Sequence, residues 1–217
     1  MKLRPGLAVV CAVVVSAVVP LALPAPAHAD PVTKQDLLTL AEAETVFPEL
    51  AGRHDDGNQD RFNFGMDVPA YWTSPLRCDH QRSYGGTSHA TASSYSLSGP
   101  DFGFLESIVQ FRTKHEARSV LQHYRDYARV CRGRHATDDG DGNAATLQVR
   151  AWRPGRVGDE AVGLLDGFTV YGRTQWRRSV VARVGRTVVL TTVEPGRGAG
   201  DPDQAVAGAR LAVAKLG

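Results

Sequence analysis

Two cysteines, Cys78 and Cys131, remain in the chain once its first 29 residues are interpreted as an export signal. Exported proteins keep disulfides, because the space outside the cytoplasm is oxidising. Two cysteines in one domain allow a single intramolecular bond, so we expect a Cys78–Cys131 disulfide that joins two distant segments. A bridge of this span stabilises a fold by about 4 kcal/mol in the chain-entropy account. The alternative is a pair of free buried thiols.

The N-terminus has the three parts of a secretory signal. Lys2 and Arg4 provide a positive start, residues 7–19 form an apolar run, and Ala27-His28-Ala29 is an A-x-A cleavage pattern. The apolar run is shorter than the ~20 residues that a membrane-spanning helix needs. We therefore expect residues 1–29 to be removed.

Cleavage between Ala29 and Asp30 would leave residues 30–217 as one secreted domain without stable membrane insertion. An uncleaved N-terminal anchor is one alternative. A lipid attached at Cys11 is another, although the apolar run continues past this cysteine.

The charge balance argues against a nucleic-acid partner. Removal of the signal takes away two basic residues and no acidic one, so the formal net charge falls from +2 to 0. General binding to a phosphate backbone needs clustered, uncompensated Lys and Arg, which a neutral domain lacks.

The first third of the domain alternates short helices with extended chain. Capping-box pairs predict one or two short helices over residues 33–50, ended by Pro48. Residues 67–78 are expected to be extended, and residues 83–99 to form a long loop or a weak edge strand. Residues 104–111 are predicted to be a well-buried strand. The residues expected to be buried or to act as anchors in the two extended stretches are Tyr71, Trp72, Leu76, Tyr84, Tyr95 and Leu97.

The clearest helix begins at Lys114 and ends near Arg132. Thr113 and Glu116 form a capping box. Apolar residues recur at helical spacing and end at Cys131, which therefore lies in line with the buried face. The predicted buried face consists of Ala117, Val120, Leu121, Tyr124, Tyr127, Ala128 and Cys131.

The second half is predicted to be an antiparallel meander after a hydrophilic loop at residues 133–144. Residues 147–151 alternate as a strand does. Asp166-Gly167 and Gly185-Arg186 are the expected hairpin turns. Asp201 is the expected cap of a final helix, with Pro202 in its first turn.

This order of elements predicts an α+β fold. Its central antiparallel sheet is packed by the long amphipathic helix and by shorter N- and C-terminal helices.

Motifs of hydrolytic chemistry are incomplete. The stretch Gly86-Thr87-Ser88-His89-Ala90 lacks the closing glycine of a nucleophile elbow. A zinc-protease motif beginning at His115 has Ser119 in the place of its second histidine. We expect neither a catalytic residue nor a metal or other cofactor.

Two acidic loops outline calcium sites without completing them. Residues 56–67 have Arg61 where the sharp turn needs glycine, and residues 139–150 end in Arg150 where a carboxylate is needed. Acidic residues are also common in exposed turns, which is the interpretation we favour.

Two further groups have a structural and a functional interpretation. The arginines of the long helix suit either a solvated face or an anion-binding surface. The aromatic residues of the later strands suit either the core or the wall of a ligand pocket. The first group is Arg118, Arg125, Arg129 and Arg132, and the second is Trp152, Trp176, Tyr171 and Phe168.

Several of these segments together resemble the PknH-like extracellular sensor domains of actinobacterial receptor kinases. The resemblance lies in the strand before the long helix, the tyrosines ahead of Cys131 and the terminal helix. It also includes three sequence motifs: Ser107-Ile108-Val109-Gln110-Phe111, Val157-Gly158-Asp159-Glu160-Ala161, and the run from Val180 to Val189.

The resemblance implies an α+β domain with a central sheet and a cleft that binds an extracellular ligand without catalysis. The chain has one expected disulfide where members of this family often have two, and it has no kinase domain. We predict a non-enzymatic, sensor-like domain that binds a small molecule or a cell-envelope component through residues that the sequence does not identify. The alternatives are a secreted hydrolase with an unrecognised site and a protein-interaction module.

Overall fold

The computed structural model describes residues 30–51, 65–95 and 102–216. Pro31–Gly217 form one compact unit. The predicted export signal lies outside the described residues. None of the described helices is long and apolar enough to cross a membrane. The elements are η1 (Lys34–Asp36), α1 (Leu40–Glu44), η2 (Pro48–Leu50), β1 (Gly65–Thr73), β2 (Leu76–Gly85), β3 (Ser88–Tyr95), β4 (Gly103–Gln110), α2 (Lys114–Val130), β5 (Gly133–Asp138), β6 (Ala144–Trp152), β7 (Glu160–Val170), β8 (Arg173–Val184), β9 (Thr187–Glu194) and α3 (Pro202–Ala214).

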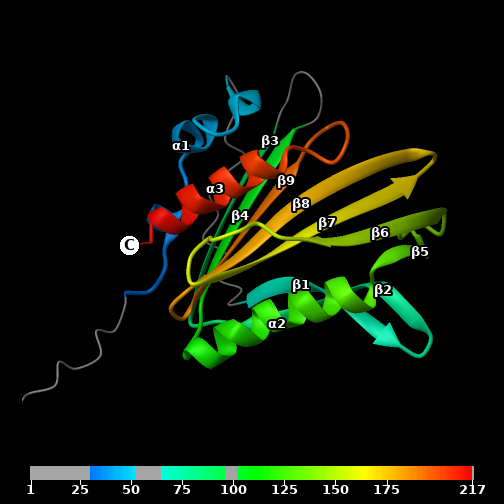
Figure 1. Cartoon of the computed structure of the whole chain (residues 1–217), viewed down its shortest axis with the longest axis horizontal. Coiled ribbons are helices and arrows are strands. Elements are labelled where there is room, and N and C mark those ends of the chain that lie inside the picture. The colour runs from blue at the N-terminus through cyan, green and yellow to red at the C-terminus, as the bar shows by residue number, and fades with distance from the viewer. Residues whose placement is uncertain (1–29, 52–64, 96–101, 217) are drawn as a thin grey trace, which may run out of the picture. The chain divides into compact units, whose positions relative to one another are not determined.

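Seven strands form one antiparallel sheet in the order β3-β4-β9-β8-β7-β6-β5. Strands β1 and β2 pair with each other in a separate two-stranded hairpin. Helix α3 covers one face of the large sheet, and α2 with the β1–β2 hairpin covers the other (Figure 1). The predicted α+β fold, with a central antiparallel sheet between helices, is confirmed.

Both faces of the sheet are buried, because successive side chains of a strand point to opposite sides. Ile108, Val180 and Val189 pack with α3 and the N-terminal segment. Their neighbours Val109, Val181 and Val188 pack with α2 and the hairpin. We call these the α3-side core and the α2-side core. Strands buried on both faces have nearly continuous apolar sequence, which explains the runs in β4, β8 and β9.

Helix α2 forms as its sequence pattern predicts. The hydroxyl of Thr113 accepts a hydrogen bond from the backbone N–H of Glu116, and the carboxylate of Glu116 accepts one from the backbone of Thr113. All seven residues of the predicted face are buried. Cys131 follows the last turn of α2 and bonds to Cys78 of β2, with 5.8 Å between their Cα atoms. The disulfide therefore joins the helix to the hairpin beside it.

The N-terminal segment packs against α3. Thr33 and Thr39 cap η1 and α1 as expected, whereas Pro48 opens η2 instead of ending the helical region. Lys215 donates a hydrogen bond to Glu42 at 2.5 Å, and this ion pair lowers the pKa of Glu42 to about 2. The two ends of the domain are thus held together across the α3-side core.

The terminal turn and helix also follow the prediction. Gly185-Arg186 connects β8 to β9. The carboxylate of Asp201 accepts a hydrogen bond from the backbone N–H of Asp203 at 2.8 Å, and Pro202 occupies the first position of α3. A proline suits this position because its missing N–H would have no partner within the helix.

The prediction that Trp72 and Leu76 are buried is wrong. Trp72 is 63% exposed and Leu76 is 45% exposed. Met66 and Val68 point into the α2-side core, but the pairing of β1 with β2 shifts register between Ala70 and Trp72. At this irregularity Trp72 is exposed, and its ring meets that of His80 edge-on.

Of two segments with a predicted loop, residues 83–99 follow the alternative prediction of an edge strand, whereas the loop predicted at residues 133–144 is wrong. Residues 83–99 include the end of β2 and the whole described length of β3, which pairs with β4. The predicted loop at residues 133–144 contains β5, which pairs with β6. Both β3 and β5 are edge strands with few apolar residues, and polar edge strands lack the hydrophobic pattern of central ones. Tyr84 is half-buried, while the side chains of Tyr95 and Leu97 are outside the described part of the chain.

The predicted hairpin turn at Asp166-Gly167 is also wrong. Strand β7 continues through both residues, and the turn comes at Tyr171-Gly172, where both residues have positive φ (50° and 72°). Positive φ at both central residues is characteristic of a type I′ turn. Gly167 serves packing instead, since a Cβ there would lie 2.7 Å from the ring of Trp176.

Candidate functional site

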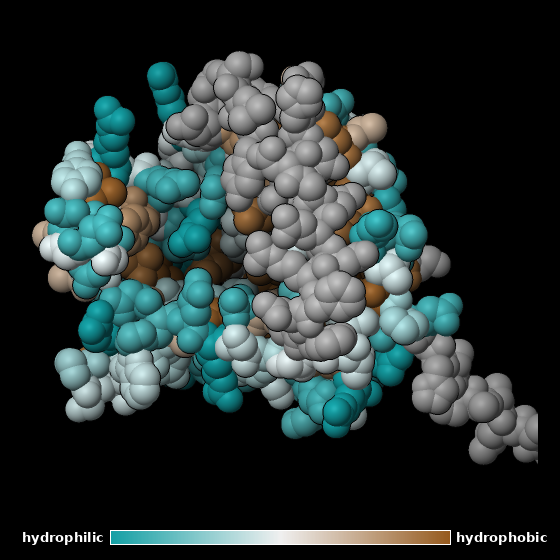
Figure 2. All heavy atoms as spheres, turned by 180° about the vertical axis from the view of Figure 1, so that it is seen from behind, coloured by the Kyte–Doolittle hydropathy of each residue, from teal (hydrophilic) through white to brown (hydrophobic). Residues whose placement is uncertain are grey.

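A pocket of about 410 Å³ opens on the α2 side of the large sheet. Its walls come from α2, the β1–β2 hairpin and strands β5 to β9. This size falls within the range of small-molecule sites, roughly 300–1,000 Å³. Seen from behind, the surface beside the grey residues is hollowed, with hydrophobic residues at the base and hydrophilic ones around it (Figure 2).

Apolar side chains of the sheet and tyrosines of α2 form the inner part of the pocket. Leu147, Leu164 and Leu190 come from β6, β7 and β9. Tyr124 and Tyr127 are about one helical turn apart, so they point to the same side of α2. These groups give a bound molecule an apolar surface with aromatic faces.

The two tyrosines differ in their hydrogen bonding. The hydroxyl of Tyr127 donates to the backbone carbonyl of Cys78 at 2.9 Å. The hydroxyl of Tyr124 has no hydrogen-bond partner among the residues that the structure describes, although Tyr124 is only 2% exposed. Burial raises the pKa of both phenols, so both remain neutral at ordinary pH. Tyr124 therefore brings an unused donor and acceptor to the pocket wall.

An ion pair between the neighbouring strands β7 and β8 forms part of the pocket lining. Asp166 and Arg177 are paired directly in the sheet, and the Nε of Arg177 donates to the Oδ2 of Asp166 at 3.0 Å. Burial raises the pKa of Asp166, while Arg177 acts in the opposite direction. Nearby, Ser179 and Thr192 share a hydrogen bond of 2.9 Å between β8 and β9. The polar side chains that β7, β8 and β9 contribute to the pocket are thus hydrogen-bonded to one another.

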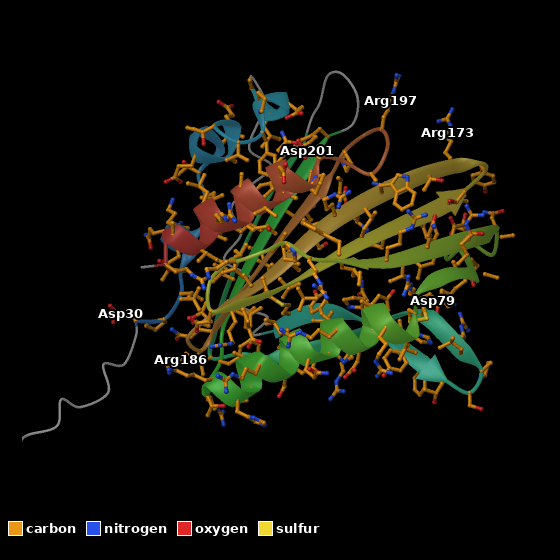
Figure 3. The ribbon with its side chains drawn as sticks, viewed as in Figure 1. Asp30, Asp79, Arg173, Arg186, Arg197 and Asp201 are labelled. Atoms are coloured by element: carbon orange, nitrogen blue, oxygen red, sulfur yellow. A yellow bond between two sulfur atoms is a disulfide. The ribbon has the colours of Figure 1, made fainter. Side chains whose placement is uncertain are left out.

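Aspartates gather at the rim, where β2 approaches β5. The hydroxyl of Thr137 on β5 donates to the carboxylate of Asp79 on β2 at 2.7 Å (Figure 3). A hydrogen bond from Arg77, at 2.8 Å, is the main reason that the pKa of Asp79 falls to about 2. Asp67, Asp138 and Asp139 also line the pocket. With five aspartates and one arginine in its lining, the pocket has a formal charge of −4 when His80 is neutral.

The predicted aromatic residues separate into three places. Phe168 lines the pocket, which agrees with a role as a ligand wall. Tyr171 is 76% exposed in the β7–β8 turn. Trp152 and Trp176 lie against Gly163 and Gly167, on the side of the sheet away from the pocket, with arginines stacked on their rings.

The arginines of α2 form a solvated, partly paired face. Arg125 donates to Glu160 at 2.9 Å, and Arg118 lies 3.8 Å from the same carboxylate. Arg129 pairs with Asp126 within the helix. Glu160 also binds Arg183 at 2.8 Å, so this cluster ties α2 to β7 and β8. These contacts favour the structural interpretation of the arginines.

The described residues that line the pocket offer little for hydrolysis, and the described ranges offer little for a metal ion. His89 and Ser107 share a hydrogen bond of 2.9 Å, but neither residue lines the pocket. Asp79 lies 3.8 Å from the Nε2 of His80, beyond hydrogen-bond distance. No group of three or more metal-binding side chains forms within the described ranges. Asp139 accepts hydrogen bonds from Asp141 and Asn143 of its own loop, as an exposed turn residue does. Most of the other acidic loop, residues 56–64 of 56–67, lies outside the described part of the chain.

Sequence reasoning missed the ion pair and most of the acidic rim. The glycine after Asp166 predicts a turn, but both residues lie inside β7, whose consecutive residues are buried on either side of Asp166. Asp79 follows Cys78 directly, so the predicted disulfide already placed it beside α2. The pairing of Asp79 with Thr137 could not be read from the chain because β5 was assigned to a loop.

Comparison with known proteins supports the fold alone. No protein-family model and no curated protein matches the chain. The extracellular domain of PknH from Mycobacterium tuberculosis is similar in structure, with a TM-score of 0.59 and 13% identity over 87% of this chain and 98% of that domain. An uncharacterised protein from Mycobacterium smegmatis aligns over 85% of this chain and 99% of its own, at 14% identity and a TM-score of 0.46. The resemblance to PknH-type extracellular domains is thus confirmed at the level of the fold.

Proposed function

We propose that this chain is an exported, sensor-like binding domain that holds a small molecule or a cell-envelope component in the pocket beside α2. The observation that carries the proposal is the combination of an apolar floor with the unpartnered hydroxyl of Tyr124. Sites for small molecules are usually concave, mostly apolar and equipped with a few polar groups that fix orientation. The secretory signal pattern and the disulfide support an extracellular location.

Binding rather than hydrolysis suits the pocket chemistry. Nucleophilic catalysis needs an activated hydroxyl or thiol beside a base that is itself oriented. Among the described pocket residues, Ser179 bonds to Thr192 and Cys78 is in a disulfide. Both groups therefore serve the structure, which supports a non-enzymatic role.

Exposed apolar residues on the β1–β2 hairpin favour a second candidate, the protein-interaction module. Trp72 and Leu76 are the large residues concerned. Aromatic residues that stand free on a surface are common anchors in protein interfaces. A Trp72→Ser variant would separate this role from ligand binding, because Trp72 does not line the pocket.

Recovery of a ligand from natural material tests the proposed function. The purified protein is incubated with fractionated envelope extract, washed, and the retained molecules are identified by mass spectrometry. We expect one class of small molecule to be retained by the native protein and by Tyr71→Phe, but several-fold less by Tyr124→Phe. Retention that is equal in all three proteins would place binding elsewhere. Turnover of a generic ester or peptide, with nothing retained, would favour the hydrolase.

A further inference from the structure

The pocket has an excess of negative charge that its own residues do not neutralise. Arg177, the arginine in the lining, is paired with Asp166. The remaining carboxylates of the lining are Asp67, Asp79, Asp138 and Asp139. Of these, Asp79 has Arg77 beside it. Clefts lined by charge of one sign attract ligands of the other sign.

A second feature of the same pocket is a hydroxyl in its wall that a ligand can reach. Tyr124 is 2% exposed and its hydroxyl has no partner among the described residues. Its oxygen is not among the buried side-chain atoms without a partner, so it keeps contact with the open space of the pocket. The hydroxyl of Tyr127, on the same face of α2, donates to the backbone carbonyl of Cys78. The phenol oxygen of Tyr124 is therefore free to accept a hydrogen bond from an N–H donor.

The inner surface is suited to an apolar body rather than to a hydrated ion. Leu147, Leu164 and Leu190 line the floor, and Phe168 adds an aromatic side chain. An inorganic cation would keep oxygen ligands or water around it and would leave this surface unused. An alkyl or aryl group would bury it, and an ammonium beside it would also gain cation–π attraction from the aromatic rings.

We propose that the pocket binds an organic cation, with an ammonium group drawn to the carboxylates of the lining and an apolar stem against the leucine floor beside Tyr124. This inference rests on the proposed function, and it specifies the class of ligand. The carboxylates of the lining attract the ammonium group, and the leucines of the floor pack against the apolar stem. Anionic molecules of the same shape are repelled by the carboxylates, and neutral ones lack the attraction that an ammonium gains.

Three compounds of nearly equal shape test the charge requirement. Isothermal titration of the disulfide-bonded, secreted protein is carried out with phenethylamine, phenethyl alcohol and 3-phenylpropionate in low salt. We expect phenethylamine to bind at least tenfold more tightly than the alcohol, and the carboxylate to give no measurable heat. Raising the salt concentration should weaken the binding of the amine, because exposed charges are screened.

Variants locate the ammonium. Asp138→Asn keeps an oxygen for the hydrogen bond from Gly140 and removes one rim charge, so we expect phenethylamine to bind roughly three- to tenfold more weakly. Asp203→Asn, an exposed change of equal charge on α3, is the control and should bind normally. Tyr124→Phe should also weaken binding several-fold, with circular dichroism used to verify folding.

Several results would overturn the cation proposal. Binding of the alcohol or the carboxylate as tight as that of the amine would do so, as would an Asp138→Asn variant that binds like Asp203→Asn. Stabilisation by calcium chloride with no response to phenethylamine would identify an inorganic cation site instead. If none of the three compounds binds, the cation proposal fails, while retention of an envelope molecule through Tyr124 would still support the proposed function.

Discussion

The carboxylate of Glu106 accepts a hydrogen bond from the backbone N–H of Leu38 at 2.8 Å. Glu106 lies on β4 and is 1% exposed, and its second oxygen has no partner among the described residues. Leu38 belongs to the N-terminal segment that packs with α3. A titratable group thus holds this segment to the sheet. The charge of Lys215 lowers the pKa of Glu106, and the charge of Glu42 raises it.

The buried carboxyl of Glu106 should make the fold less stable as the pH rises. Burial is the main cause that raises its pKa from 4.5 to about 7. A raised carboxyl pKa means that the folded state binds the proton more tightly, so this stabilisation is complete below pH 4.5 and is lost as the pH rises through 7. Glu106→Gln should therefore gain stability relative to the native protein between pH 4.5 and pH 8, by up to about 3 kcal/mol.

Urea unfolding of Glu106→Gln and of the native protein at pH 4.5 and pH 8 measures this gain in the free energy of unfolding. An Asp141→Asn variant, which removes an exposed loop carboxyl, serves as the charge-matched control and should show no such pH dependence. Equal stability of Glu106→Gln and the native protein at every pH would show that Glu106 titrates normally.

Gly208 is expected to be needed because the ring of Phe47 leaves no room for a side chain there, and not because the helix favours glycine. Alanine is favoured over glycine inside a helix by about 1 kcal/mol. A Cβ at Gly208 would, however, lie 2.5 Å from the Cζ of Phe47. Phe47 is fully buried, so its ring has little room to move, and overpacking costs about 1–3 kcal/mol. We expect Gly208→Ala to lower the melting temperature.

A second substitution determines whether packing is the reason. In a Phe47→Leu background, Gly208→Ala should no longer destabilise and should regain some of its helix preference. Ala207→Gly, at an exposed neighbouring position, gives the cost of glycine in this helix, about 1 kcal/mol. If Gly208→Ala raises the melting temperature of the native protein, the contact with Phe47 does not control this position.

Removal of the disulfide should loosen the pocket wall. Cys78 lines the pocket and Cys131 ends the buried face of α2. Replacement of both by alanine should reduce the free energy of unfolding by about 2–4 kcal/mol. Chemical unfolding with and without reductant measures this loss, and the variant itself should not respond to reductant. A native protein whose stability is unchanged by reductant would contradict a stabilising role.

The sequence was most informative where burial imposes a period on the chain. The spacing from Ala117 to Cys131 predicted both the helix α2 and the side that faces the core. The central strands were recognised because residues such as Ile108 and Val109 are buried on opposite faces. The edge strand β5 escaped this reasoning, since it has polar residues at most positions and depends on pairing with β6.

The candidate site was harder to predict because its residues meet through tertiary structure. Tyr124 was identified as a core residue from its helical spacing, and the same spacing cannot reveal that its hydroxyl reaches a pocket. Asp79 and Thr137 come from separate sheets. The shift in register between β1 and β2 beside Trp72 has no signature in composition or alternation.

Arg177 is expected to control the titration of Asp166. Asp166 is buried, and Arg177 on the neighbouring strand provides the opposing charge. Tyr124 and Tyr127 of α2 and Glu194 of β9 are the other titratable groups around the pair. In Arg177→Met the carboxylate would lose its cation, so burial would raise the pKa of Asp166 further. We expect this variant to lose about 1–3 kcal/mol of stability at pH 7.

The pH dependence separates loss of the charge from loss of packing. A raised carboxyl pKa destabilises the folded state as the pH rises, so the deficit of Arg177→Met should shrink when the pH is lowered toward 4.5. Asp166→Asn added to Arg177→Met should recover stability at pH 7, because no buried charge remains. Arg173→Met, at the exposed start of the same strand, is the control (Figure 3). A deficit of the same size at every pH would mean that Arg177 acts through the packing of its side chain and not through its charge.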